Sequence, residues 1–359
     1  MSTDQPKPGI SKRGRVLVIS GISLMVLLLI ALLVPVPFIR MAPGPTFNVI
    51  GDRDGKPMIE VSGTKTYPVT GELRMTTVLE SGGPRGGLTF VSALASWFNS
   101  NDAVVPRELI YPDEVSGDDV KSEQAVMFSS SESDAIGAAT TYLKIPTTEQ
   151  VVISQVGGDA PATGKLESGD VVKSVNAIAI TESKQITQII QGAPVGSTFT
   201  FSVIRDGKPK DVQVTSAVSP RDEKTPYVGV GIGTTYQPNF DVTFNVDGVG
   251  GPSAGLTLTM GLIDKLTPGD LTAGKVIAGT GTIKPDGTVG PIGGIRQKLA
   301  GASATQAKLF LMPASHCKEA AGHVPAGLTV TPVKNLAQAM AAVQKWTTGQ
   351  TVPACPSLQ

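Results

Sequence analysis

Cysteine and histidine are scarce in this chain of 359 residues, which holds two of each. All four, Cys317, Cys355, His316 and His323, lie near the C-terminal end. A zinc site made of cysteine and histidine ligands is therefore excluded from the rest of the chain, and we expect no metal centre.

An excess of charge of either sign is also absent. Thirty lysine and arginine residues balance thirty aspartate and glutamate residues, and charged residues make up only 17% of the chain. A dedicated nucleic-acid-binding protein normally carries a strong basic excess, so we expect no nucleic-acid partner. The 41 glycines and 27 prolines indicate many turns, and the length predicts two or three domains.

Glycine loops that bind nucleotides are missing as well. The nearest approach to the G-x-x-x-x-G-K-[ST] phosphate loop is Gly164-Lys165, which lacks the first glycine and the final hydroxyl residue. The run Gly229–Gly233 lacks the third spaced glycine and the following helix of a dinucleotide site. We therefore expect no ATP or NAD site and no cofactor.

One long apolar run is present near the N-terminus. Residues 16–39 contain no charge, and as a helix they would cover about 36 Å, against the ~30 Å of a bilayer core. A cleaved signal peptide is the alternative, but its apolar part is shorter, and Pro35–Arg40 offers no small-x-small cleavage site. The sequence predicts a transmembrane anchor, with the lipid bilayer as a partner.

The charges that flank this run predict its orientation. Lys7, Lys12, Arg13 and Arg15 precede it, whereas only Arg40 follows closely. The positive-inside rule then leaves residues 1–15 as a cytoplasmic tail and places the rest outside the cytoplasm. We expect a single-pass protein of the cell membrane with an extracytoplasmic body.

Residues 42–130 are expected to form the first part of that body. Residues 71–79 alternate like a strand, and residues 88–98 carry apolar side chains at helical spacing. Residues 99–130 look like a polar loop. The serine-rich run 129–134 then predicts an N-cap for a helix over about 134–143.

The segment 131–220 has the pattern of a small β-rich domain. The run Leu166–Asn176, which includes Gly169-Asp170, is followed by a helix near 182–192 and by two strands joined at Asp206-Gly207. This pattern resembles a bacterial PDZ domain, with Ala177 where glycine is usual. The resemblance implies binding of extended peptides by addition of a strand; a mixed β domain that merely spaces two others is the alternative.

Ser253 lies where a glycine-rich loop meets a buried helix. The loop is Asp247-Gly-Val-Gly-Gly-Pro-Ser-Ala-Gly-Leu256, and the apolar residues after it follow helical spacing. A helix N-terminus offers unpaired N–H donors, so Gly251 and Ala254 are candidate donors to an oxyanion. A serine that only caps the helix is the alternative.

A nucleophilic serine needs a base, and both histidines lie in a late loop. Lys298 is the candidate, because a buried lysine can lose its proton near working pH. It lies in a helix that follows Gly293-Gly294, between small apolar neighbours.

Two segments together resemble the proteolytic domain of Lon-type serine proteases. Gly250–Leu258 is similar to the serine motif of that family, although the common aspartate is Gly250 here. Gly279–Ile283 and Gly287–Leu299 are similar to its lysine segment. The resemblance implies that Ser253 is the nucleophile, that Lys298 is the general base, and that the hydroxyl of Thr280 helps to orient the lysine.

The whole chain resembles the bacterial membrane-anchored, PDZ-containing Lon-like proteases, and the expected fold class is α+β. The limits are 16–39 for the anchor, 42–130 for the first part of the protease domain, 131–220 for the PDZ domain, 225–345 for the Lon-type domain and 346–359 for a tail. Residues 225–252 are too few to supply the strands before the serine. We therefore expect the PDZ domain to be an insertion, with residues 45–125 packed against 225–345.

The function implied is that of an ATP-independent serine endopeptidase with a Ser-Lys dyad. Its substrates would be unfolded or exposed protein segments outside the cytoplasm, and the chains could form a homo-oligomeric ring. A catalytically inactive PDZ scaffold is the alternative from another class. A trypsin-like PDZ protease is excluded, since no histidine precedes the serine.

The two cysteines form a candidate disulfide, because disulfides persist outside the cytoplasm. A bond between Cys317 and Cys355 would close a loop of about 39 residues and fasten the tail to the protease domain. Two free thiols are the alternative.

Overall fold

The computed structural model describes residues 11–83, 86–111, 117–220, 222 and 224–356. Contacts divide the chain into a smaller unit, Met1–Pro43 with Val78–Val120, and a larger unit, Gly44–Thr77 with Lys121–Gln359. Most of the expected tail 1–15, including Lys7, lies outside the described residues.

The smaller unit contains the apolar helix. Its elements are α1 (Lys12–Leu33), β1 (Pro35–Val36), the first part of β2 (Phe38–Asn48), β7 (Leu88–Thr89), α2 (Phe90–Trp97), β8 (Ala103–Pro106) and a 3-10 turn at Arg107–Leu109. β1 pairs with β7 and β2 pairs with β8, both antiparallel. An ion pair of 2.7 Å between Arg40 and Asp102 holds this second pair together.

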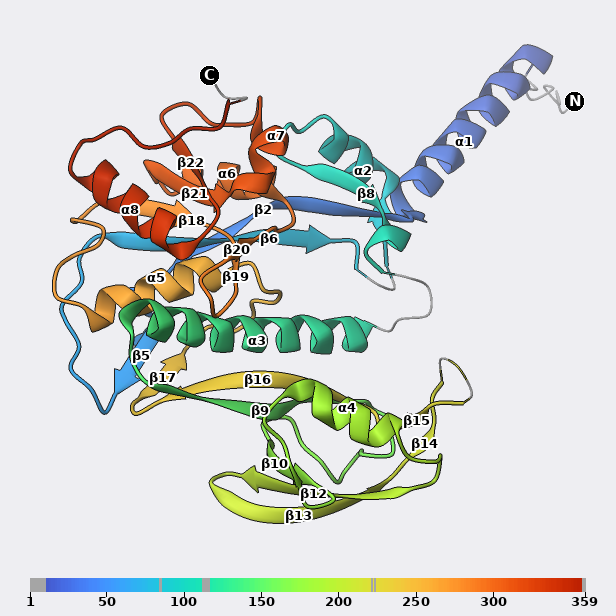
Figure 1. Cartoon of the computed structure of the whole chain (residues 1–359). Helices are drawn as coiled ribbons and strands as arrows, with labels where there is room; N and C mark the ends of the chain where they lie inside the picture. Colours follow the sequence, from blue (N-terminus) through green and yellow to red (C-terminus); the bar gives the residue numbers. More distant parts are fainter. Residues whose placement is uncertain (1–10, 84–85, 112–116, 221, 223, 357–359) are drawn as a thin grey trace, which may run out of the picture. The chain divides into compact units, whose positions relative to one another are not determined.

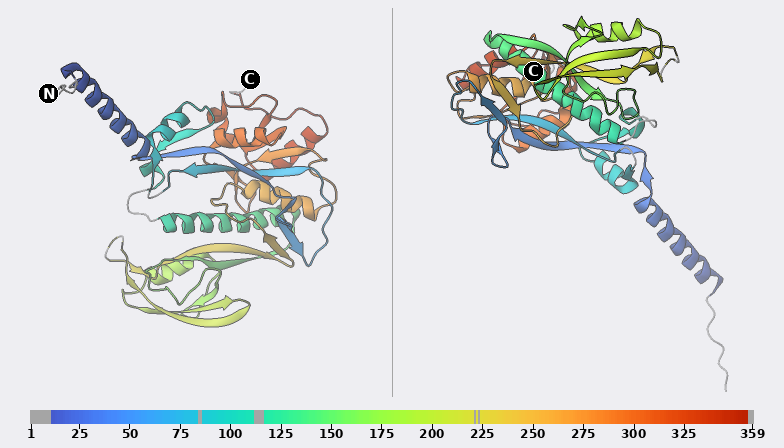
Figure 2. Two further views of the ribbon diagram at one scale, coloured as in Figure 1. Left: turned by 180° about the vertical axis from the view of Figure 1, so that it is seen from behind. Right: turned by 90° about the horizontal axis from the view of Figure 1, so that it is seen from below.

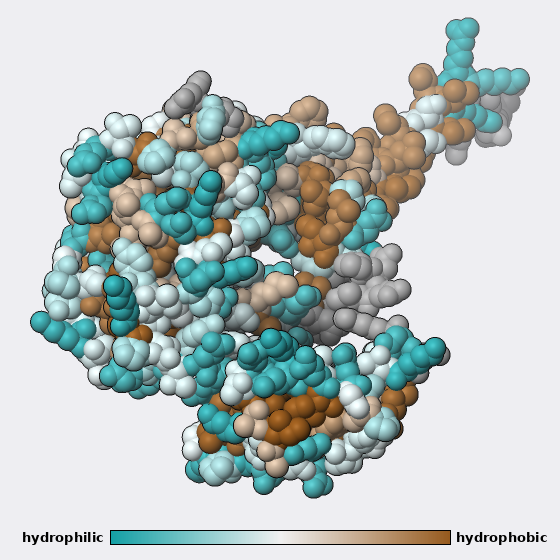
Figure 3. Space-filling model, in the orientation of Figure 1, coloured by the Kyte–Doolittle hydropathy of each residue, from teal (hydrophilic) through white to brown (hydrophobic). Residues whose placement is uncertain are grey.

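Helix α1 is long and apolar enough to cross a membrane, which fits a single-pass anchor or a signal sequence. In Figure 3 it is hydrophobic over most of its length and hydrophilic at its N-terminal end. The expected span 16–39 is wrong at its end, because the helix stops at Leu33. Pro35 and Pro37 lack N–H donors and restrict the residues before them, so the chain turns extended there.

The larger unit is built on a sheet with strand order β22-β21-β18-β6-β2 (Figure 1). The strands are β22 (Thr329–Val333), β21 (Leu309–Pro313), β18 (Val276–Gly279), β6 (Glu72–Ser81) and the second part of β2. β18 is parallel to both β21 and β6. Side chains alternate across β21: Leu309 and Leu311 join one apolar cluster, and Phe310 and Met312 join another.

Helices cover both faces of this sheet. Side chains of α5 (Gly255–Leu266), α8 (Leu336–Thr347) and the C-terminal part of α3 (Gly117–Leu143) pack in the first cluster. Side chains of α6 (Ile295–Ala304) and α7 (Cys317–Ala320) pack in the second. The helix that follows Ser253 and the helix that carries Lys298 therefore lie on opposite faces of one sheet.

Segments from before and after the PDZ region share this domain. β6 pairs with β18, and β5 (Ile59–Ser62) pairs with β17 (Asp241–Phe244). Figures 1 and 2 show the blue strands beside the orange ones, while one continuous green-to-yellow stretch forms the PDZ part. The PDZ domain is thus inserted, as expected. Short hairpins complete the unit: β3 (Asp52–Arg53) with β4 (Lys56–Pro57), and β19 (Thr282–Ile283) with β20 (Val289–Gly290).

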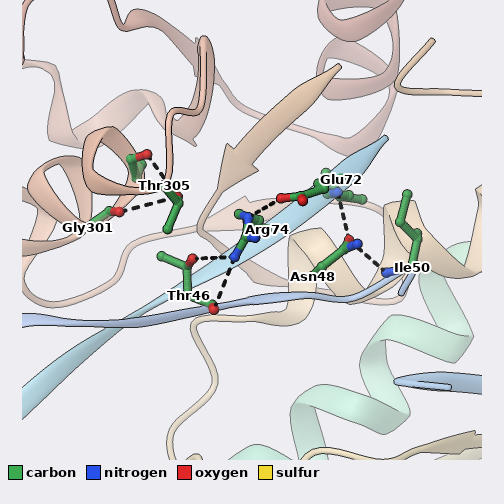
Figure 4. Close-up of polar contacts among 9 residues, drawn as sticks. Thr46, Asn48, Ile50, Glu72, Arg74, Gly301 and Thr305 are labelled. Carbon is green, nitrogen blue, oxygen red and sulfur yellow. Dashed lines mark hydrogen bonds and ion pairs between the residues drawn. The ribbon is translucent and has the colours of Figure 1, made fainter. Parts of the chain in front are cut away.

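Polar contacts fasten β2 to β6 (Figure 4). The guanidinium of Arg74 pairs with Glu72 and donates to Thr46 Oγ1 at 3.0 Å. Asn48 Oδ1 accepts from the backbone N–H of Leu73 at 3.0 Å. These contacts hold in place strand β6, which also contains Thr76, the residue whose carbonyl contacts Lys298.

The PDZ part has strand order β13-β12-β10-β9-β16, with a short β11 beside β10. Its elements are β9 (Thr147–Val156), β10 (Val171–Val175), β11 (Ile178–Ala179), α4 (Ser183–Gln191), β12 (Thr198–Arg205), β13 (Lys208–Thr215), β14 (Ala217–Val218), β15 (Pro226–Tyr227) and β16 (Val230–Pro238). Asp170 and Arg205, from the two ends of the sequence pattern, form a doubly hydrogen-bonded ion pair with both distances at 2.6 Å.

Two expected limits are wrong here. Strand β16 pairs with β9 in the PDZ sheet, so the protease domain does not begin at 225. Helix α3 begins at Gly117, so residues 117–130 are not a loop and the serines do not cap a helix at 134. Two of these serines bond to other segments instead: Ser131 Oγ donates to Pro252 O, and Ser133 Oγ donates to Thr234 O, both at 3.0 Å.

Ala177 occupies a backbone conformation that suits glycine. It and Asn176 form the turn between β10 and β11, with φ values of 63° and 50°. Replacing Ala177 with glycine should stabilise the PDZ domain by about 1 kcal/mol, because the left-handed conformation penalises a Cβ. Hydrogen-exchange protection of the β10 amides measures this. Ala179→Gly, in strand β11, is the matched control and should lower protection; a loss of protection in Ala177→Gly would contradict the turn.

The cysteines are bonded to each other, with 5.4 Å between the Cα atoms of Cys317 and Cys355. Cys355 is fully buried among the apolar side chains that include Ala320 and Leu328. The segment after α8 is therefore held against the protease core, as the sequence predicts.

Candidate active site

Ser253 is presented by a loop held on both sides. The loop ends two residues before α5, as expected, and Ser253 is half-buried. The Ser253 carbonyl accepts hydrogen bonds from the Gly281 N–H at 3.0 Å and from Thr280 Oγ1 at 3.1 Å. These two bonds fix the backbone of the serine against the chain that follows β18.

Lys298 reaches the serine from helix α6. Its Nζ lies 2.6 Å from Ser253 Oγ, 3.0 Å from Thr280 Oγ1 and 3.1 Å from the carbonyl oxygen of Thr76. The side chain is only 2% exposed. Ser253, Lys298 and Thr280 are thus brought together as the sequence predicts, while the carbonyl of Thr76 is an addition that sequence reasoning missed.

Burial lowers the pKa of Lys298 from 10.5 to about 7. The ammonium form loses its hydration in this apolar surrounding, and the three groups that contact Nζ are two hydroxyls and a carbonyl, none of which carries a charge. A large fraction of neutral amine therefore exists near neutral pH. A neutral amine beside a hydroxyl can remove its proton, which is the arrangement that nucleophilic catalysis needs.

This lowered pKa makes folding stability depend on pH. In the unfolded chain the lysine stays protonated up to about pH 10.4, whereas the folded protein releases that proton near pH 7, so stability should rise with pH between these values. From pH 7 to pH 9 the gain should be about 2 kcal/mol. Denaturant unfolding of the native chain and of Lys298→Met at several pH values measures it. Parallel pH curves for the two proteins would contradict a buried, titrating lysine.

The candidate oxyanion donors have different surroundings. The N–H of Gly251 donates to the carbonyl of Gln124 on α3, at 3.0 Å. Gly251 has φ +78°, and a Cβ there would meet the Gln124 side chain. Ala254 is buried directly before α5. The role of these donors stays a prediction, and for Gly251 it requires release of the bond to Gln124.

Helix α3 joins the serine loop to the PDZ sheet. Gln124 and Ser131 contact the loop at Gly251 and Pro252, and Ser133 contacts β16 at Thr234. Sequence reasoning missed this helix contact, and the only signal was the serine-rich run itself.

His316 supports the lysine helix and is not a base for the serine. Its Nε2 accepts from the N–H of Ile292 at 2.9 Å, and its Nδ1 lies 3.1 Å from a carboxylate oxygen of Glu319. Ile292 precedes α6 by three residues, so the histidine, next to Cys317 in sequence, fixes the entry to the helix that bears Lys298.

The PDZ sheet has a peptide-binding candidate at its edge. Strand β16 is the last strand of the sheet and contacts α4. It follows Tyr227-Val228-Gly229, where Gly229 has φ +75° and Val228 is buried in the PDZ core. An edge strand next to a helix is the place where extended peptides can add to a sheet. The run Gly229–Gly233, which lacks the pattern of a nucleotide loop, therefore forms the entry to this strand and its first four residues.

Comparison with known families agrees with this geometry. Residues 126–215 match the family model of the PDZ domain, and residues 246–345 match that of the Lon protease (S16) C-terminal proteolytic domain. The chain therefore combines a PDZ domain with a Lon-type serine protease domain. β16 lies between the two matched regions, so neither match assigns it to a domain. Its pairing with β9 is what places it in the PDZ sheet.

Individual relatives match short stretches. The chain is 34% identical over 74 residues to a probable periplasmic serine endoprotease, DegP-like, of Pseudomonas fluorescens; the match covers 20% of this chain and 16% of that relative. Among solved structures, the PDZ domain of the SdrC-like protein of Listeria monocytogenes is 22% identical, with 23% of this chain and 86% of that chain covered and a TM-score of 0.22. A solution structure from Geobacillus thermodenitrificans is 26% identical, with 23% of this chain and 94% of that chain covered and a TM-score of 0.21.

Proposed function

We propose that this protein is an ATP-independent serine endopeptidase with a Ser253–Lys298 dyad. The observation that carries the proposal is the distance of 2.6 Å between Lys298 Nζ and Ser253 Oγ in a buried surrounding that favours the neutral amine. Thr280 supports it by contacting both residues, through the Ser253 carbonyl and the lysine Nζ.

The reaction follows from these contacts. Neutral Lys298 accepts the proton of Ser253 Oγ as the oxygen attacks the scissile carbonyl carbon. The ammonium then gives this proton to the leaving amine, which leaves an acyl-enzyme ester on Ser253. Lys298 next accepts a proton from water, whose oxygen attacks the ester, and returns it to Ser253 Oγ as the new carboxyl product departs.

Substrate recognition would use the PDZ edge. A peptide in extended form would add to β16 beside α4, with the backbone N–H groups near Gly229 next to its end. The PDZ domain would present to the dyad those substrate segments that are already unfolded or exposed, because the dyad needs an extended backbone within reach. α1 would anchor the protein in a membrane, with the body outside the cytoplasm and residues 1–15 inside.

The direct test is incubation of the purified full chain with an unfolded protein, followed by mass spectrometry of the products. We expect internal cleavage without ATP that is lost in Ser253→Ala. If an active-site serine reagent labels no residue and no product forms, the inactive PDZ scaffold is the correct function.

A further inference from the structure

Helix α2 is oriented against the usual rule for a soluble protein. Its buried side chains are the small Ala93 and Ser96. Its large apolar side chains point outward, and with the next residue, Phe98, they are 43–86% exposed: Phe90, Val91, Leu94, Trp97 and Phe98. A helix in water normally buries its large apolar face, so this exposed face indicates another apolar surrounding.

The start of α2 is attached to the end of the apolar helix α1. α1 ends at Leu33, and the next strand pairs with the strand that immediately precedes α2, with Pro35 opposite Thr89. α1 and α2 are also in direct contact. Gly87 permits this close approach, because a Cβ there would lie 2.4 Å from the carbonyl oxygen of Val36.

The composition of α2 matches the border between lipid and water. Residues 90–98 contain no charge, and their last two residues are Trp97 and Phe98, which are 75% and 86% exposed. Tryptophan and other aromatic residues favour the headgroup region, and interfacial helices bury an apolar face of this kind. The helix is about 12 Å long, so its face is much smaller than the ~800 Å² per partner that a stable protein interface buries.

We propose that α2 lies in the headgroup region of the bilayer that α1 crosses, with Trp97 and Phe98 inserted among the lipids. The inference rests on the membrane anchor of the proposed function. The pairing of β1 with β7 keeps the start of α2 close to the point where α1 leaves the bilayer. The smaller unit thereby has two attachments to the membrane, a spanning helix and a surface helix.

The two tryptophans of the chain make the test selective. In full-length Trp346→Phe, Trp97 is the sole tryptophan. Reconstituted in phosphatidylcholine–phosphatidylglycerol vesicles, its emission should shift to the blue and fall to about half when the acyl chains are brominated close to the headgroups. The matched control, Trp97→Phe, keeps Trp346, which packs against Lys275 in the larger unit, and should show no quenching by these lipids.

Emission of Trp97 as in water, with full access to acrylamide and no quenching by brominated lipid, would overturn the inference. Extraction of the same vesicles with alkaline carbonate separates this from failure of the anchor: a chain that stays in the membrane with Trp97 in water contradicts only the role of α2. If carbonate releases the full chain, or a chain that the cell has cleaved after α1, the anchor and the role of α2 are both contradicted. Peptidase activity in the same sample reports on the dyad independently.

Discussion

Lys298→Arg should remove peptidase activity as completely as Ser253→Ala, with a loss of about 10⁴-fold or more in kcat. A guanidinium does not lose its proton at working pH, so it cannot accept one from Ser253 Oγ. Among the described residues, the groups that bond to Nζ are Thr76 O, Thr280 Oγ1 and Ser253 Oγ, and none of them carries a charge that could change this. Cleavage of a fluorogenic unfolded protein by the purified variants measures the effect.

The matched control is Lys308→Arg, an exposed lysine in the same domain, which should keep native activity. Circular dichroism should show that all variants are folded. Appreciable cleavage by Lys298→Arg would refute the role of the lysine, whereas cleavage by Ser253→Ala would refute the nucleophile.

The same base predicts how activity depends on pH. Protonated Lys298 is inactive, so kcat/KM should be low in acid and should rise through about pH 7, the pKa set by burial. An ordinary exposed lysine would place this rise near pH 10.4. A rate profile that is flat from pH 6 to pH 8 would show that this lysine is not the base.

Loss of the disulfide should cost about 4 kcal/mol of stability, because the bond closes a loop between residues 38 positions apart. Cys355→Ala tests this by denaturant unfolding. Cys317→Ala and the double variant should lose the same amount, since each removes one and the same bond. Native protein in a reductant should match them.

Thiol counting on the native chain, unfolded without reductant, is the control. We expect no reactive thiol; two reactive thiols would show that the bond is absent. Because Cys317 adjoins His316, which holds the entry to α6, the variants should also lose activity at temperatures well below their unfolding midpoint.

The candidate site could be predicted from the sequence because most of its chemistry belongs to side chains. Ser253 and Lys298 lie in glycine-rich segments, and the sequence offers few other candidates for a nucleophile and its base. The hydroxyl of Thr280 belongs to the same pattern. Thr76 could not be predicted because it contributes a backbone carbonyl, which any residue type would supply. The strand-like alternation of residues 71–79 was the available signal.

The errors in the fold come from pairing and from tertiary contacts. The pattern of β16 shows a strand but not its partner, so residues 230–238 could not be assigned to the PDZ sheet. The serines of α3 suited an N-cap by type, but Ser131 and Ser133 use their hydroxyls on Pro252 and Thr234. The insertion of the PDZ domain was predictable because residues 225–252 are too short to complete a protease domain.

The hydrogen bond from Lys298 to Thr76 also has a consequence for biosynthesis. It joins residues 222 positions apart, and the PDZ domain and Ser253 lie between them in the chain. During synthesis Thr76 leaves the ribosome 222 residues ahead of Lys298. The PDZ sheet, whose strands β9 to β16 pair with one another, can fold while the protease sheet still lacks β18 and β21. A nascent chain therefore has no assembled site until Lys298 has left the ribosome.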